Sequence, residues 1–352
     1  MDTSLENDCP ILRFDHLEFY VGNARQAANF YRQQFGFMVT AYRSLETGER
    51  KAAAYVLEQG NIRFVLTSAF KPDNPIAQFA LKHGDSVAAI AFEVADVNQV
   101  YRQVRQRGAI AIIPPTEITD EMGVFRYAAV QGYGDMLIKL IERQQYRGAF
   151  APGFVPNKIS STDWQDRGLT NLDHVVGNVG EGAMDKWVDF FIKVFGFELL
   201  VHFDDKTIAT EYTALMSKVV QDPTGNIKLP INEPAPGKRL SQIAEYLQYH
   251  QGPGVQHIAL ATNNIIDTVT QLKAAGVKFL SPPPTYYEGL AARVGQIAEP
   301  LDKLAQLGIL VDRDADGYLL QIFTQPVQDR PTLFFEIIER HGATGFGAPV
   351  YT

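Results

Sequence analysis

The sequence predicts an α+β protein made of two similar halves, each a sheet with covering helices. One reason is length, because 352 residues exceed what one hydrophobic core usually holds. A second is an internal repeat, since residues 11–143 and 169–340 carry short apolar segments in the same order. A third is a stretch rich in Gly, Pro, Ser and Asn between the repeats. These observations predict a first domain at 1–150, a linker at 151–168 and a second domain at 169–352.

Each half opens with a strand-like run, residues 12–19 or 171–176, and a helical pattern follows. In the second half, apolar residues at helical spacing end before Gly196, which lies between two phenylalanines. Gly36 has the same setting in the first half. A glycine at this place is typical of a left-handed C-cap, so both helices should end there.

The later segments repeat as well. The sequence predicts paired strands at 86–92 and 254–260, N-caps at Asp96 and Asn264, and final strands at 136–143 and 333–340. The second half has two segments that we expect to be insertions, at about 207–249 and 286–316. Extra loops on one copy indicate function on that copy.

Composition excludes several classes of protein. A net charge of −8 without a basic stripe argues against nucleic acid as a partner. No apolar run approaches the roughly 20 residues that cross a bilayer. Cys9 is the only cysteine and the first ten residues lack a secretory signal, so we expect a cytoplasmic protein without an internal disulfide.

Superposing the halves predicts a metal site in the second one. His174 aligns with His16, His257 with Ala89, and Glu336 with Lys139. Two histidines and one carboxylate form the ligand set of non-haem iron(II) oxygenases, whereas a lysine would oppose a cation. Both His257 and Glu336 lie in apolar strands, where an ionised carboxylate needs a compensating charge.

A simpler interpretation is that the two histidines are hydrogen-bonded core residues and that Glu336 faces solvent. It is the better one for each residue alone, but the coincidence of all three at repeat-equivalent positions favours a metal. We expect the other histidines to be structural or superficial: His16, His83, His202, His250 and His341.

Five segments of the second half resemble the 4-hydroxyphenylpyruvate dioxygenase family: 254–260, 281–287, 308–314, 320–324 and 329–338. The first half resembles it more loosely. The resemblance implies the vicinal oxygen chelate fold, built from paired βαβββ modules, with iron(II) in the second domain. It also implies the same three ligands that the repeat selects.

The family's pocket positions fall on residues that the pattern alone would not select. The resemblance implies catalytic roles for Gln242, Gln256 and Gln321, and substrate contacts for Ser217, Asn232, Phe323, Phe334 and Phe346. Aromatic walls and uncharged polar groups suit a planar phenol.

The implied reaction converts 4-hydroxyphenylpyruvate and O₂ to homogentisate and CO₂, by oxidative decarboxylation, ring hydroxylation and side-chain migration. The implied assembly is a homodimer or homotetramer. Whether homogentisate feeds tyrosine and phenylalanine breakdown or quinone and tocopherol synthesis stays open. The family usually continues its Gly-Phe-Gly turn with a helix over the pocket, but here residues 348–352 follow, so we expect a short or missing lid.

Three alternatives share the fold. 4-Hydroxymandelate synthase acts on the same substrate, but its relatives tend to carry an aliphatic residue where this chain has Phe323. A non-catalytic binding protein would have lost ligands in both halves. Extradiol cleavage of catechols uses the same ligands, but the segments between His257 and Glu336 fit the oxo acid enzymes better.

Overall fold

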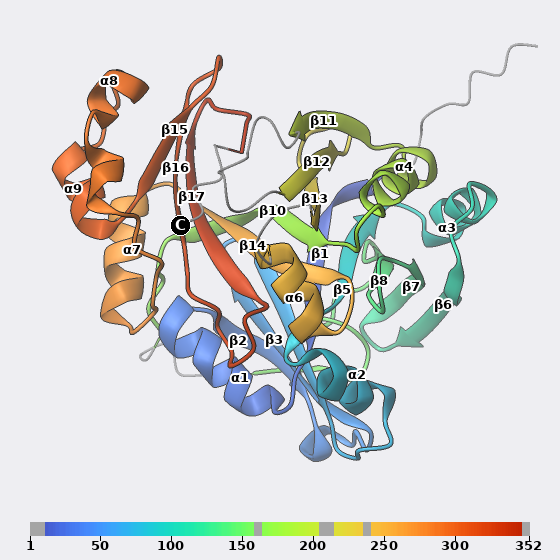
Figure 1. The fold of residues 1–352 in the computed structure, drawn as a ribbon. Helices are drawn as coiled ribbons and strands as arrows, with labels where there is room; N and C mark the ends of the chain where they lie inside the picture. The colour runs from blue at the N-terminus through green and yellow to red at the C-terminus, as the bar shows by residue number, and fades with distance from the viewer. Residues whose placement is uncertain (1–10, 158–163, 204–214, 235–240, 347–352) are drawn as a thin grey trace, which may run out of the picture.

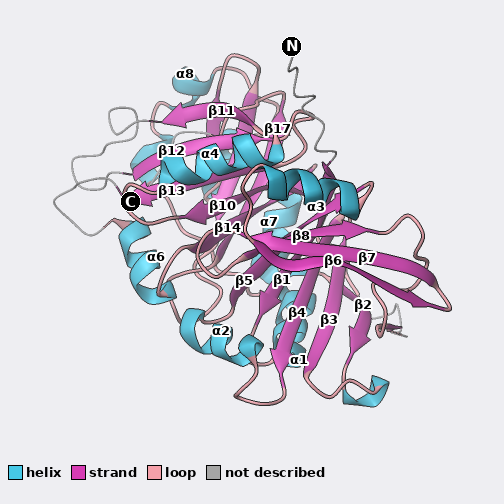
Figure 2. Ribbon diagram, turned by 90° about the vertical axis from the view of Figure 1, so that its right-hand side faces the viewer, coloured by secondary structure: helices cyan, strands magenta, loops and turns pink. Residues whose placement is uncertain are grey.

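The computed structural model describes all residues except 1–10, 158–163, 204–214, 235–240 and 347–352 (Figure 1). Its strands form two sheets, one from each repeat, and this confirms the duplicated α+β architecture. Figure 2 shows the strands crossing the middle of the molecule, with helices lying over them. In the part of the chain that is described, no helix is both long and apolar enough to cross a membrane.

The first sheet has nine strands in the order β6-β7-β8-β5-β1-β4-β3-β2-β9. Its strands are β1 (Ile11–Tyr20), β2 (Met38–Arg43), β3 (Ala52–Gln59), β4 (Ile62–Ala69), β5 (Ser86–Val94), β6 (Ala111–Asp120), β7 (Gly123–Gln131), β8 (Leu137–Glu142) and β9 (Val155–Pro156). The helices of this half are α1 (Ala24–Phe30), which continues as a π-helix (Tyr31–Phe35), α2 (Pro75–His83) and α3 (Val97–Gln106).

The second sheet has eight strands in the order β11-β12-β13-β10-β14-β17-β16-β15. Its strands are β10 (Leu169–Asn178), β11 (Glu198–Phe203), β12 (Leu215–Gln221), β13 (Lys228–Pro234), β14 (Gly254–Thr262), β15 (Leu310–Arg313), β16 (Tyr318–Phe323) and β17 (Phe334–His341). The helices are α4 (Met184–Phe195), α6 (Gln242–His250), α7 (Ile265–Ala274), α8 (Leu290–Val294) and α9 (Leu301–Leu307).

Strand register confirms how the two halves align. In the first sheet, Ala91 pairs with both His16 and Lys139. In the second sheet, Ala259 pairs with both His174 and Glu336. His16 and His174 therefore hold one position of the repeat, and Lys139 and Glu336 hold another. Two residues upstream of each alanine, Ala89 corresponds to His257.

The predicted helix ends are also confirmed. Gly36 and Gly196 end their helices in the left-handed region, with φ of 76° and 74°. The side chains of Asp96 and Asn264 accept hydrogen bonds from the backbone N–H groups of the residues three positions on. Local sequence therefore determines where these helices begin and end.

One predicted insertion is wrong, and the other is confirmed except for β15, which corresponds to β6. Most of residues 207–249 is not inserted, because β12, β13 and α6 correspond to β3, β4 and α2. Residues 286–316 do contain added structure, since α8 and α9 have no counterpart between α3 and β6. The expected linker also contributes to the first sheet, because β9 pairs with β2.

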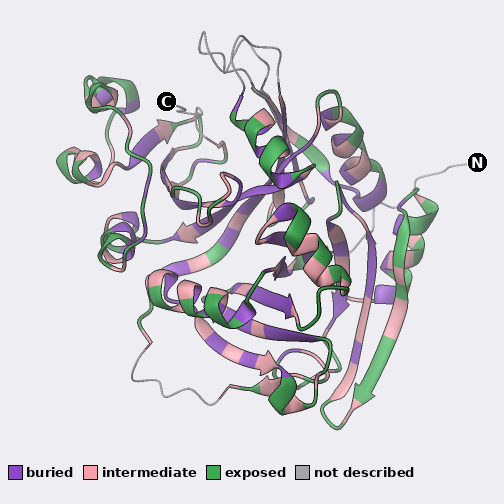
Figure 3. Ribbon diagram, turned by 60° about the horizontal axis from the view of Figure 1, so that its bottom comes forward, coloured by how far each residue is buried: buried purple, intermediate pink, exposed green. Residues whose placement is uncertain are grey.

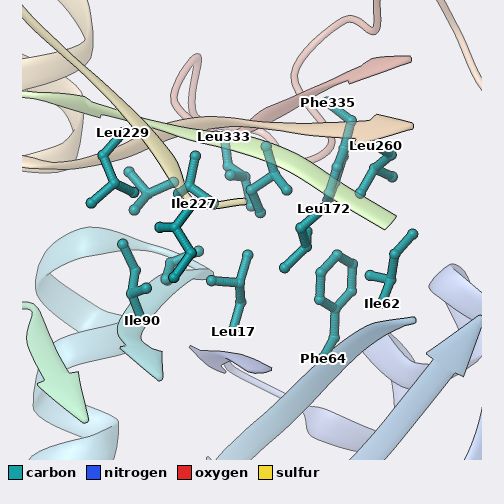
Figure 4. Packing of buried hydrophobic residues seen from close by; sticks show 14 of the residues in the cluster. Leu17, Ile62, Phe64, Ile90, Leu172, Ile227, Leu229, Leu260, Leu333 and Phe335 are labelled. Carbon is teal, nitrogen blue, oxygen red and sulfur yellow. The ribbon is translucent and has the colours of Figure 1, made fainter. Parts of the chain in front are cut away.

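One hydrophobic core joins the two halves (Figure 4). Phe335 of β17 is fully buried, and its ring centroid lies 5.0 Å from that of Phe35 and 6.1 Å from that of Phe64, both in the first half. Figure 3 shows the same arrangement at larger scale, with buried strands inside and exposed residues on the outer faces of the helices. The halves should therefore fold as one cooperative unit.

We predict that Phe335→Ala lowers the free energy of unfolding by about 3–5 kcal/mol, because it leaves a cavity between the halves. Urea denaturation followed by circular dichroism measures the change. Phe70→Ala is the control, since Phe70 is 38% exposed and its loss should change stability by less than about 0.5 kcal/mol. Two separate transitions in the unaltered protein would contradict the shared core.

Candidate metal centre

Three neighbouring strands bring His174, His257 and Glu336 together. The residues come from β10, β14 and β17, which lie side by side in the second sheet. All three are buried, and their ligand atoms lie within 4.8 Å of one another. The Oε2 atom of Glu336 is 3.1 Å from Nε2 of His174 and 3.5 Å from Nε2 of His257.

The two imidazoles make their hydrogen bonds through Nδ1, which leaves the Nε2 atoms available to a cation. Nδ1 of His174 lies 2.7 Å from a carboxylate oxygen of Asp173, and Nδ1 of His257 lies 3.1 Å from the amide oxygen of Gln256. Both oxygens are acceptors, so each Nδ1 donates and each Nε2 can offer a lone pair to a metal.

One oxygen of the Glu336 carboxylate is also available to a cation. Its Oε1 atom is buried and has no hydrogen-bond partner among the described residues. An orphaned carboxylate oxygen beside two converging imidazoles is the chemistry that a divalent cation satisfies. The residues present therefore fit a metal ion.

Burial and the neighbouring charged groups shift the pKa of each of the three residues. Burial alone would raise the pKa of Glu336, but His174 and His257 outweigh it and lower that pKa to about 2. Burial opposes protonation of His174, yet the carboxylates of Glu336 and Asp173 raise its pKa. For His257 burial prevails and the pKa falls. A proton on His174 would compete with a metal for Nε2, so metal binding should weaken as pH falls.

Aromatic rings surround the ligands. Phe334 stacks on His257 with ring centroids 4.7 Å apart, and Phe323 meets the same imidazole edge-on at 6.0 Å. Phe346 meets His174 edge-on at 4.9 Å. The structure therefore places all three expected phenylalanines beside the ligands, where they form apolar walls.

The expected polar residues are placed less uniformly. Ser217 and Asn232 are buried and pair directly across β12 and β13. Gln256 is buried next to His257 and contacts it. Gln321 is buried and donates to Asp312 over 2.9 Å. Gln242 differs from them, because it is the exposed first residue of α6.

Two residues at the site were missed from sequence. Arg340 forms a two-pronged ion pair with Asp173, with nitrogen–oxygen distances of 2.7 and 2.8 Å. A signal was present, because Asp15 and Arg143 hold the same repeat positions and form the same pair. It was not recognised because these pairs join residues far apart in sequence.

The remaining histidines behave as structural residues where the structure describes them. His16 is buried against Asp15, and His83 and His250 stack at 4.4 Å between the halves. His341 bridges Glu299 and Glu339, at 3.1 and 3.0 Å. The repeat partner of Glu339 is Glu142, which pairs with Arg126 in the first half. The side chain of His202 lies outside the described part, as do residues 348–352, on which the expectation of a short or missing lid rests.

Comparison with known proteins gives the family. The profile of the Glyoxalase/Bleomycin resistance protein/Dioxygenase superfamily matches residues 13–134 and 171–322. The 4-hydroxyphenylpyruvate dioxygenase of Dictyostelium discoideum is 46% identical over 344 residues, which are 95% of this chain and 94% of that protein. The enzyme of the same name from Caenorhabditis elegans is 45% identical over 95% of this chain and 88% of its own length.

A solved structure is similar throughout. A mutant of 4-hydroxymandelate synthase from Streptomyces coelicolor superposes with a TM-score of 0.85 at 31% identity, over 96% of this chain and 95% of that one. The duplicated sheets and the family match are thus consistent with each other. This chain belongs to the Glyoxalase/Bleomycin resistance protein/Dioxygenase superfamily and, within it, to the 4-hydroxyphenylpyruvate dioxygenase family.

Proposed function

We propose that this protein is a 4-hydroxyphenylpyruvate dioxygenase, which converts 4-hydroxyphenylpyruvate and O₂ to homogentisate and CO₂. The observation that carries the proposal is the convergence of His174, His257 and Glu336 in a buried, aromatic-walled site of a chain from this family. We place catalysis in residues 169–352, with 1–150 as a non-catalytic domain and 151–168 as the linker.

The metal in this proposal is iron(II), held by His174, His257 and Glu336. Two histidines and a carboxylate on one side of an ion leave adjacent positions open, as in non-haem iron oxygenases. When bound, iron(II) would supply Lewis acidity toward the oxo acid and a place for O₂ to react. The family relatives named as dioxygenases support this choice of metal.

The protein's own residues orient the substrate and keep water away. Phe323, Phe334 and Phe346 offer apolar faces to the phenol ring beside the ligands. Ser217, Asn232, Gln242, Gln256 and Gln321 are the proposed polar contacts. Uncharged groups of this kind can bind hydroxyl and oxo oxygens without adding a net charge to the buried site.

We also propose a cytoplasmic homo-oligomer. The acidic net charge of −8 and the single cysteine support a reducing compartment and a small-molecule substrate rather than nucleic acid.

The second candidate is 4-hydroxymandelate synthase, which the similar solved structure favours. Such an enzyme would hydroxylate the side chain instead of the ring. Phe323 supports ring attack, because its side chain lies edge-on to both His257 and Phe334 and limits where the substrate ring can rest.

We predict that Glu336→Ala and His174→Ala lose bound metal and the O₂ uptake that 4-hydroxyphenylpyruvate induces. Each variant removes one of three ligands and leaves the metal too few donors. After anaerobic loading with iron(II), metal content, O₂ uptake and homogentisate are measured together.

His16→Ala is the matched control for that experiment. His16 is as buried as His174 and also contacts an aspartate, but it faces no metal ligands. The His16→Ala protein that folds should still bind iron(II) and still take up O₂ with 4-hydroxyphenylpyruvate. If the unaltered protein bound iron(II) but formed no homogentisate, the proposed reaction would be wrong, and 4-hydroxymandelate as product would identify the second candidate.

We predict that Phe323→Leu shifts the product ratio from homogentisate toward 4-hydroxymandelate, because a smaller side chain lets the substrate ring move against His257. Chromatography of the products after complete turnover measures the ratio. Phe125→Leu is the control, since Phe125 is buried in a separate cluster of the first half. An unchanged ratio in Phe323→Leu would show that this ring does not select the position of attack.

A further inference from the structure

We propose that Asp173 and Arg340 are positioning residues for the metal centre: they fix the orientation and basicity of His174 and anchor the segment Ala343–Phe346 to it. The proposal rests on the metal-binding role of His174 in the proposed function. Neither residue is a proposed metal ligand or a proposed substrate contact.

The contact between His174 and Asp173 is charged and buried. Only 4% of the His174 side chain and 9% of the Asp173 side chain are exposed. A carboxylate that accepts the Nδ1 proton fixes the tautomer, turns the ring and makes Nε2 a stronger donor to a metal. His257 lacks such a partner, because its Nδ1 faces the uncharged amide of Gln256. The two histidines should therefore differ in donor strength, with His174 the stronger.

Arg340 holds Asp173 from the other side. Its Nε and Nη2 atoms reach the two oxygens of Asp173, so the carboxylate cannot rotate freely. The guanidinium thus places a positive charge 2.7 and 2.8 Å from the two oxygens of the carboxylate that faces His174.

The same guanidinium anchors the chain that follows β17. Its Nη1 atom donates to the carbonyl oxygens of Ala343, at 3.2 Å, and Gly345, at 2.5 Å. The guanidinium lies 5.4 Å from the ring centroid of Phe346, which in turn meets His174. One arginine thus connects a metal ligand to a proposed wall of the substrate pocket.

The first half contains a natural copy of this arrangement without the metal ligands. Arg143 pairs with Asp15, Asp15 contacts Nδ1 of His16, and the ring of Phe150 lies 5.2 Å from His16 and 4.6 Å from the Arg143 guanidinium. Ala89 and Lys139 stand where His257 and Glu336 would be. The Asp, Arg and Phe contacts around this histidine therefore form where no metal site exists. In the second half the same contacts should hold His174 in position before a metal binds.

Comparing equivalent variants in the two halves distinguishes a role in positioning His174 from a role in stabilising the sheet. If the pair only stabilises a sheet, Asp173→Asn and Asp15→Asn should behave alike. If it positions a ligand, both variants should lose stability but only Asp173→Asn should lose metal affinity. An amide in place of the carboxylate preserves size and removes the charge.

The test measures cobalt(II) affinity by competition with a chelator, without substrate, together with urea unfolding of the metal-free proteins. We expect Asp173→Asn to weaken cobalt(II) binding about 10- to 100-fold, the usual effect of removing a partner of a ligating histidine. Asp15→Asn should change affinity by less than about 2-fold. Equal loss in both variants, or loss in neither, would overturn the proposal.

Arg340→Met and Arg143→Met form a second matched pair in case Asp173→Asn fails to fold. Arg340→Met should weaken cobalt(II) binding and, in the iron-loaded enzyme, raise KM for 4-hydroxyphenylpyruvate more than it lowers kcat, because Phe346 loses its anchor. Arg143→Met should do neither, and equal effects would again overturn the proposal. If the unaltered protein bound no metal, the proposed function itself would have failed, which is a distinguishable result.

Discussion

The buried carboxylate of Glu336 is the constraint on which the second half depends. It lies in an apolar strand, one of its oxygens has no partner among the described residues, and the other faces two imidazoles. An ionised carboxylate removed from water costs several kcal/mol unless positive charge compensates it. Neutral imidazoles provide no such charge, and a divalent cation between the three side chains would supply it without a proton on His174.

In the first half, the positive charge that compensates a buried carboxylate comes from a lysine side chain. Lys139 stands at the position of Glu336, and its ammonium pairs with Glu18. Register places Glu18 opposite Ala89, just as Val176 lies opposite His257. Three differences between the halves, at these repeat positions, thus convert a site that needs a metal into one that carries its own ion pair. Asp15, Arg143 and Phe150 of the first half keep the contacts that Asp173, Arg340 and Phe346 make in the second.

Sequence alone predicted the parts of the fold that depend on local pattern. The repeat register and the helix ends needed only apolar spacing and residues such as Gly196 and Asn264. Residues 207–249 were misjudged because Glu233 follows Leu229 and Ile231 on one face of β13, and Pro230 is unusual inside a strand, which hides the equivalence to β4.

The candidate site was predictable to a different extent. Its three ligands followed from comparing the halves, whereas the pocket residues required a resemblance to a known family. The bond from Arg340 to Asp173 joins residues 167 positions apart, and no local pattern predicts such a contact. The exposure of Gln242 likewise depends on how α6 packs against the sheet.

Strand β17 explains why a half without metal ligands is still required. Successive side chains of a strand point to opposite faces, so Glu336 faces the metal site while Phe335 faces the core between the halves. Rings from the π-helix that continues α1 and from β4 hold Phe335 in place. Any movement of the first half would therefore shift β17 and the carboxylate that it carries. The first half acts on the chemistry through packing, by fixing one ligand's position from the opposite face of its strand.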